Sequence, residues 1–353
     1  MTSIDPDSVL GPPADPDGLL SHRSESGRVS GRRWAAFEAW FGKHRFLIVF
    51  ALLASLMGVS VGMAQVTTSL YAVQLGSSAS MLGLIAGAQS IGVLIMSLPV
   101  GMLVDRFGPA RPFVVGTSLV GGIYALLSFS GSSLALLAGT ALISFAMPLR
   151  FVSLNTVFFE QLAALGEGKA GWYRGTHMLG MFLVGPLLGA TLVSATGVAW
   201  AYRAIASLFF VTIAVSPIVF VRYGVRPVAA RALGWRALKA QLGLLASDAE
   251  VRRVSALESL TQATGSYFTF FIVVVALQVA GLNASQASTL ISAKGITYIV
   301  ALFLLGGAVR RLGPVRATLA SFACLALSLA AIGLSQHRLW LWAGSLGLGL
   351  GLG

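Results

Sequence analysis

Residues 101–112 read GMLVDRFGPARP, a short charged segment between two long apolar runs. The segment recurs 205 positions later, where residues 306–316 read GGAVRRLGPVR with the Gly-Pro pairs in register. A Gly-Pro pair is typical of a turn, and Pro112 suits the first turn of a following helix because no backbone donor is needed there. The repeat therefore predicts two related halves, each with the same basic turn between two helices.

The composition indicates a membrane protein. Of the 353 residues, 56% are hydrophobic and only 10% are charged, whereas soluble domains have about 25% charged residues. The formal net charge is +12, and the Lys and Arg residues concentrate in the N-terminal tail and in alternate loops. This is the positive-inside pattern of a multi-pass protein and argues against nucleic acid as a partner. The single cysteine, Cys324, excludes a disulfide framework, and we expect neither a metal site nor a cofactor.

Apolar runs that cross a bilayer as helices need about 20 residues. By that length the sequence predicts nine spans and the start of a tenth, at residues 46–68, 81–104, 112–131, 133–158, 175–195, 200–221, 256–279, 286–308, 315–334 and from 339 onward. The fold class is therefore all-α integral membrane, with two pseudo-symmetric six-helix halves of which the second is incomplete. The repeat maps Gly353 onto Pro148, within the fourth span, so we expect a fragment that ends in its tenth span.

The spans and the composition divide the chain into four regions. Residues 1–31 are rich in Pro, Asp, Ser and Gly, which predicts a disordered cytoplasmic tail. Residues 32–222 form the first bundle, residues 223–255 a cytoplasmic linker with an amphipathic helix, and residues 256–353 the truncated second bundle.

The charged segment is a candidate gate at the inner mouth of the bundle. Its carboxylate, Asp105, can stabilise the N-terminus of a neighbouring helix or pair with an arginine across the gate. The alternative is a positive-inside loop with one stray acid. Gly101 leaves room for another helix to approach closely. We predict a gate made of Gly101, Asp105, Arg106, Gly108, Arg111 and Glu160, with a repeat at Gly306, Arg310, Arg311, Gly313 and Arg316.

The pattern G-x3-D-R-x-G of residues 101–108 resembles the loop 2–3 motif of the major facilitator superfamily. The two halves, the long central linker and the degenerate second copy fit the same family from about residue 40 onward. The chain departs from the family pattern where Pro109 and Ala110 replace basic residues and where Arg310 replaces an acid. The resemblance implies a secondary transporter that moves a small-molecule substrate by alternating access, as a monomer in the lipid bilayer.

The fifth predicted span resembles the glycine/proline motif of drug–proton antiporters, which implies proton-coupled efflux. A proline kinks a helix, and small residues permit close helix packing. Ordinary glycine-rich packing is the alternative explanation for the same residues. The residues concerned are Gly180, Gly185, Pro186 and Gly189.

Two buried basic residues are candidates for the transport path. Lys294 lies near the middle of the eighth span and its repeat counterpart is Gln89, so both halves place a polar group at one depth. Lys294 could bind an anionic substrate or titrate during coupling; the alternative is a lysine that snorkels toward an interface. Arg150 resembles, weakly, the fourth-helix arginine linked to proton coupling in antiporters, and the alternative is a structural pair with Glu160 or Asp105.

The polar strips of the first and seventh spans, represented by Gln65 and Gln262, complete the predicted path. Together these features predict a multi-pass transporter of the inner cell membrane, with a cytoplasmic N-terminus, that exports a small molecule against proton entry. The alternative is a facilitator or a proton-coupled importer of a small polar solute. A multi-span membrane enzyme or a sensor is the alternative from another class, and the four scattered histidines disfavour the enzyme.

Overall fold

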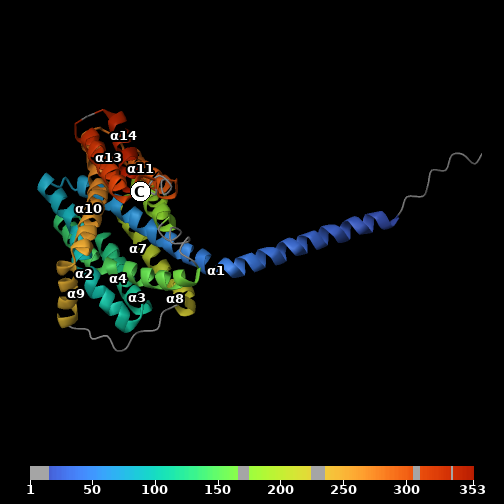
Figure 1. Cartoon of the computed structure of the whole chain (residues 1–353). Coiled ribbons are helices and arrows are strands. Elements are labelled where there is room, and N and C mark those ends of the chain that lie inside the picture. The colour runs from blue at the N-terminus through green and yellow to red at the C-terminus, as the bar shows by residue number, and fades with distance from the viewer. Residues whose placement is uncertain (1–15, 166–174, 224–234, 305–310, 335–336) are drawn as a thin grey trace, which may run out of the picture. The chain divides into compact units, whose positions relative to one another are not determined.

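All regular elements in the part of the chain that the structure describes are helices (Figure 1). This computed structural model describes residues 16–165, 175–223, 235–304, 311–334 and 337–353. The chain divides into two compact units, residues 1–48 and residues 49–353. All contacts described below lie within residues 49–353.

The first half begins in α1 (Pro16–Gln74). It continues through α2 (Ala79–Phe107), α3 (Ala110–Leu127), α4 (Ser133–Leu165), the π-helix η2 (Leu179–Val184), α6 (Gly185–Thr196), α7 (Val198–Val215) and α8 (Pro217–Tyr223). The linker contains α9 (Trp235–Ser247), and the second half comprises α10 (Ala249–Gln278), α11 (Ala284–Leu304), α13 (Pro314–Leu334) and α14 (Arg338–Leu352).

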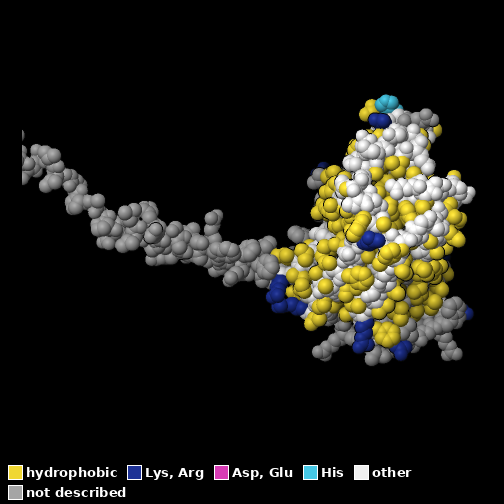
Figure 2. All heavy atoms as spheres, turned by 180° about the vertical axis from the view of Figure 1, so that it is seen from behind, with side chains coloured by type: hydrophobic (Ala, Val, Ile, Leu, Met, Phe, Trp, Pro, Cys, Tyr) yellow, Lys and Arg dark blue, Asp and Glu magenta, His cyan; other side chains and the backbone are white. Residues whose placement is uncertain are grey.

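Eight helices among the described residues are long and apolar enough to cross a membrane. They coincide with eight of the spans predicted from the sequence. The predicted span 286–308 corresponds to α11, which carries Lys294 and is not one of the eight, and the incomplete tenth span corresponds to α14. Figure 2 shows apolar side chains over most of one face, with several Lys and Arg side chains toward its lower end. The prediction of an all-α, multi-pass membrane protein is confirmed.

The 205-residue repeat is visible in the backbone. Both copies of the basic turn place their glycine at positive φ, with 74° at Gly108 and 79° at Gly313. The preceding turn repeats in the same way, with 62° at Gly76 and 60° at Gly281. Residues with a Cβ rarely adopt these values, so both halves depend on glycine at the same two places.

The helix starts repeat as well. The Ser78 hydroxyl accepts a hydrogen bond from the Met81 backbone at the start of α2, at 3.3 Å. The equivalent bond at the start of α11 runs from the Gln286 backbone to the Asn283 side chain, at 2.8 Å. Each side chain satisfies a backbone donor that has no partner inside its own helix. The two halves therefore use the same capping position with different residue types.

One close contact between two helices occurs in both halves, but its glycine lies on a different helix in each half. In the first half, Gly92 on α2 donates a backbone hydrogen bond of 3.1 Å to the Ser144 hydroxyl on α4, and a Cβ on Gly92 would overlap the backbone of Phe145. The equivalent positions in the second half are Thr297 on α11 and Gly349 on α14, where a Cβ on Gly349 would overlap the Thr297 hydroxyl. The glycine thus stands on the second helix of one half and on the fourth helix of the other.

Two boundaries differ from those predicted. Residues 16–31 are helical and belong to α1, whereas the sequence predicts a disordered tail over 1–31; residues 1–15 lie outside the described residues. Once a helix has formed, each further residue adds one backbone hydrogen bond, which favours its extension. α10 begins at Ala249 rather than near residue 256, because the Asp248 carboxylate caps it by accepting from the backbone of Glu250 at 2.8 Å.

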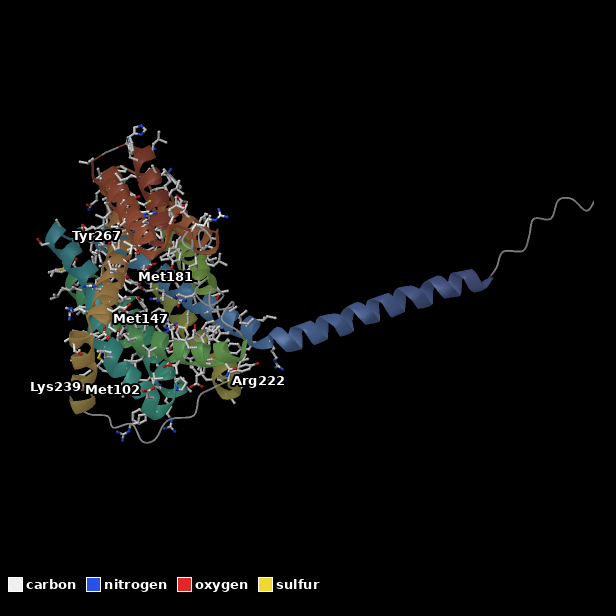
Figure 3. The ribbon with its side chains drawn as sticks, in the orientation of Figure 1. Met102, Met147, Met181, Arg222, Lys239 and Tyr267 are labelled. Carbon is white, nitrogen blue, oxygen red and sulfur yellow. The ribbon has the colours of Figure 1, made fainter. Side chains whose placement is uncertain are left out.

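The two ends of the bundle are distinguished by their turns. Because successive spans alternate in direction, the turns at Gly76, Gly197 and Gly281 lie at one end, here called the Gly76 end. The turns at Gly108 and Gly313 lie at the other, the Gly108 end. In Figure 3 the side chains of Met102, Arg222 and Lys239 all lie toward the lower end of the molecule, which is the Gly108 end.

The two halves pack against each other toward the Gly76 end. One buried apolar cluster joins the later parts of α1, α6 and α10 to the early part of α11, and includes Val66, Leu70, Ala190, Val193, Ile272, Val273, Ala276, Leu282, Ala287 and Leu290. Toward the Gly108 end, α10 is exposed: from Ala249 to Gln262 only Ser255 and Thr261 are partly buried. The contact between the halves is therefore uneven along the bundle axis.

Candidate functional site

Lys294 lies at a contact between the two halves and is fully buried, with 0% of its surface exposed. Its ammonium donates a hydrogen bond of 2.9 Å to the Thr269 hydroxyl on α10. It also lies 4.1 Å from the ring centroid of Phe182 on η2 and 5.2 Å from that of Phe268 on α10. A cation over an aromatic face is stabilised by about 1–2 kcal/mol when water is excluded. Three helices from two halves thus surround one charged group, the Lys294 cage.

The Thr269 hydroxyl is oriented to accept from Lys294. It donates its own proton to the Gly265 carbonyl at 2.7 Å, one helical turn earlier on α10. A hydroxyl has one donor and two acceptor lone pairs, so its remaining capacity faces the ammonium. This arrangement holds Lys294 toward the contact between the halves rather than toward an interface, so the snorkelling alternative does not describe its position.

The π-helix η2 places Phe182 on Lys294. The Gly185 backbone donates to the Gly180 carbonyl, five residues earlier, just before Pro186 removes a backbone donor. Across the contact, Gly295 follows Lys294 on α11, and a Cβ at Gly295 would overlap the Phe182 side chain. The absence of a side chain at Gly295 is therefore what allows the ring to reach the ammonium.

The glycines of the fifth helix pack against α1. A Cβ on Gly180 would lie 2.5 Å from the Ser55 carbonyl oxygen, and one on Gly185 would lie 2.7 Å from the Val59 carbonyl oxygen. On α1, Gly58 makes the reciprocal approach to Met181, which Figure 3 labels. Close packing against α1 is therefore one role of these glycines.

Arg150 occupies separate surroundings within the first half. It is fully buried, with 0% exposed, and its guanidinium carbon lies 4.0 Å from the ring centroid of Phe209 on α7. Its Nη1 lies 3.8 Å from the Met147 sulfur. Neither Phe209 nor Met147 contributes to the Lys294 cage, so these contacts do not bring the two basic residues together.

The other predicted path residues are placed differently from one another. The Gln65 side-chain oxygen is buried on α1 without a hydrogen-bond partner among the described residues. Gln89, the repeat counterpart of Lys294, is half-buried on α2. Gln262 is exposed on α10. The structure therefore brings none of the three into the Lys294 cage.

The gate motif lies at the Gly108 end. Asp105 is half-buried near the end of α2, whereas Arg106, Arg111 and Glu160 are exposed. Among the described residues, no atom lies within 4 Å of the place that a Cβ would take on Gly101. The close helix approach expected at Gly101 is therefore not found among the described residues. In the second copy, Arg311 and Arg316 are exposed and Gly313 has its positive φ, while Gly306 and Arg310 lie outside the described residues.

Sequence reasoning missed Phe182, Phe268 and Thr269. The polar strip predicted on the seventh span lies on the same helix as Thr269 but does not include it. No pattern in the sequence singles out either phenylalanine, because a ring in an apolar span is ordinarily a packing residue. Gly295 next to a buried lysine was the available signal for a close contact at this place.

The fold and the buried charge between two repeated halves define a membrane transporter. A family model of the Major Facilitator Superfamily matches residues 29–353. The chain belongs to this superfamily, and as a member it is a transporter and not an enzyme. A comparison with curated proteins gives no significant match.

Solved structures of transporters share the fold. A mutant of the nucleoside transporter NupG gives a TM-score of 0.71 at 14% identity, covering 87% of this chain and 80% of that one. The peptide transporter POT in complex with sulfate gives 0.63 at 17% identity, covering 87% and 79%. PepTSo2, in a tetrameric crystal structure, gives 0.64 at 14% identity, covering 88% and 82%. These neighbours are not drug–proton antiporters, and at these identities the likeness shows the fold alone.

Proposed function

We propose that the chain exports a small molecule across the inner cell membrane by alternating access, with proton entry as the driving force. The observation that carries this proposal is the Lys294 cage, in which Phe182 from the first half covers an ammonium from the second. A charged group at the contact between two repeated halves is where facilitator-type carriers bind their cargo.

The uneven packing of the halves supports alternating access. The halves are joined by buried apolar residues toward the Gly76 end, and α10 is exposed toward the Gly108 end. If the basic turns are cytoplasmic, as the positive-inside pattern indicates, the more exposed end of α10 faces the cytoplasm in this conformation. With the basic turns inside, the N-terminus is cytoplasmic too.

The direction and the coupling ion are the finer parts of the proposal. Export against protons rests on the resemblance of the fifth helix to antiporters, and its glycines also have a packing role. Nucleosides and peptides are the cargoes that the names of the structural neighbours suggest for a first panel of compounds.

Inverted membrane vesicles test the proposal. Vesicles with an acidic interior would be incubated with radiolabelled uridine, dialanine and benzoate, and vesicles without the protein would serve as the control. We expect at least one compound to accumulate inside and to release protons from the vesicles as it does so. Transport of a compound at the same rate with and without the proton gradient indicates a facilitator. Gradient-driven uptake of a compound into intact cells indicates an importer. Either result overturns the proposal of export.

A further inference from the structure

The groups that contact the Lys294 ammonium in the described part of the chain are electrically neutral. They are the Thr269 hydroxyl and the rings of Phe182 and Phe268. Among the residues that the structure describes, no carboxylate lies within ion-pair distance of the Lys294 nitrogen. Buried charges in proteins are normally paired or bound to a ligand, because the loss of hydration must be compensated. In its ammonium form Lys294 therefore lacks a counter-charge within the cage.

The ammonium has hydrogen-bonding capacity left for such a counter-charge. Of its three N–H donors, one is directed to Thr269, and the other two have no hydrogen-bond acceptor among the residues that the structure describes. Thr269 has already given its own proton to Gly265. Lys294 is consequently the donor in the cage that a ligand oxygen can engage, and a charged oxygen makes the stronger bond.

The two aromatic rings beside Lys294 favour a ligand that has an apolar part as well as a charged group. Phe182 comes from the first half and Phe268 from the second, so a ligand bound at Lys294 has one aromatic ring from each half near its binding group. Aromatic rings pack well against one another in offset or edge-to-face geometry. From the charge and the rings together we infer that the site binds a small organic anion with an aromatic body, held by Lys294 and enclosed by Phe182 and Phe268.

This inference rests on the proposed function, because it assigns a substrate class to the same inter-half site. It also separates the possible classes by charge. An organic cation would have to displace the Lys294 ammonium from the two rings, and a neutral solute would leave the charge unbalanced. Since Phe182 covers the ammonium, entry of the anion requires Phe182 to move away from Lys294, which couples binding to the contact between the halves.

Three matched probes test the charge selectivity without any mutation. Benzoate, benzamide and benzylamine share one ring and differ in carrying a negative, a neutral or a positive group. Their binding to the purified full chain would be measured by calorimetry in nanodiscs of zwitterionic phosphatidylcholine. We expect benzoate to bind at least about tenfold more tightly than either analogue, as a charge-assisted hydrogen bond predicts. Equal or tighter binding of benzamide or benzylamine overturns the inference.

A lipid headgroup is the other source of an anion for this lysine. Repeating the titration in nanodiscs that contain anionic phosphatidylglycerol separates the two sources. If the site binds a soluble substrate anion, benzoate should bind more tightly than benzamide and benzylamine in both lipids. Loss of benzoate binding only in the anionic lipid assigns the lysine to a headgroup and contradicts a substrate site.

Variants then tie the selectivity to the cage. Lys294→Met should remove the preference for benzoate over benzamide, and Lys294→Arg should keep part of it because the positive charge remains. Lys239→Met is the matched control, since Lys239 is exposed on α9 at the Gly108 end (Figure 3), and it should bind like the original chain. If Lys294→Met does not fold, the comparison of probes and the arginine variant still decide the question.

Failure of this inference and failure of the proposed function give different results. Calorimetry requires neither a gradient nor net movement. Benzoate-selective binding without gradient-driven transport would refute the exporter and leave the anion site standing. Gradient-driven transport of uridine or dialanine without any preference for benzoate in binding would refute the anion site and leave the exporter standing.

Discussion

Gly108 and Gly313, which are 205 positions apart in the chain, adopt nearly the same positive φ of 74° and 79°. Each stands between two membrane helices, in a segment where the two halves share the Gly-Pro sequence. A shared backbone conformation at positions that only glycine occupies readily is strong evidence for a structural repeat. The repeat is the basis for treating the molecule as two bodies that move against each other.

Replacing Gly108 by alanine tests this constraint. With φ at 74° and ψ at 163°, Gly108 lies in a region that is essentially restricted to glycine, and a Cβ there costs about 1–3 kcal/mol. Gly108→Ala should lower the melting temperature of the purified protein. Gly122→Ala is the control, because Gly122 lies within α3 with open space around it and alanine favours a helix. An equally small effect of both changes would contradict the assigned turn.

The exchanged contact between the second and fourth helices of each half gives a second prediction. Gly349→Ala should destabilise the protein by about 1–3 kcal/mol, because the new Cβ overlaps the Thr297 hydroxyl and the Lys294 carbonyl. Combining it with Thr297→Gly removes the first overlap and not the second, so stability should return only in part. Gly333→Ala, with open space on α13, is the control. Thermal unfolding followed by circular dichroism measures these three variants and Thr297→Gly alone, and full additivity of the two changes would contradict the contact.

The glycines of the fifth helix give a third prediction. A methyl group on Gly180 would press on the Ser55 carbonyl oxygen at 2.5 Å and on the Val59 nitrogen at 2.8 Å. Because backbone atoms cannot move aside as side chains do, Gly180→Ala should lower the unfolding temperature clearly. A variant that stays as stable as the original while its transport alone changes would favour a coupling role over packing.

The spans were predictable because they depend on length and hydrophobicity, which are local properties of the sequence. The turns at Gly108 and Gly313 were predictable because a repeated Gly-Pro pair has few other uses. The Lys294 cage was predictable only at its centre, since a charge in an apolar span is conspicuous. Its walls were not, because Phe182 reaches Lys294 only through the π-helical register of η2 and the space left by Gly295. Long-range packing of this kind leaves no periodic pattern in the sequence.

Lys294 itself gives a fourth prediction. Lys294→Ala should abolish substrate movement in vesicles while expression and folding remain intact, because the ammonium is the charged group at the contact between the halves. Lys294→Arg should retain part of the activity. Lys239→Ala, an exposed change on α9, should transport normally. Near-normal turnover in Lys294→Ala would remove Lys294 from the transport path.

Alternating access requires the two halves to move against each other, so that one end opens as the other closes. Two pairs of equivalent, accessible positions report on it: Ala110 with Val315 at the Gly108 end, and Ser80 with the exposed Ser285 at the Gly76 end. Each pair would be changed to cysteine in a Cys324→Ser background and spin-labelled. The distance between the two labels would be measured by pulsed electron–electron double resonance in nanodiscs, in acidic and in alkaline buffer.

We expect the two distance distributions to shift in opposite directions between the two buffers, with the Gly108-end pair approaching as the Gly76-end pair separates. Distances that stay constant at both ends, or that change in the same direction at both ends, would contradict alternating access.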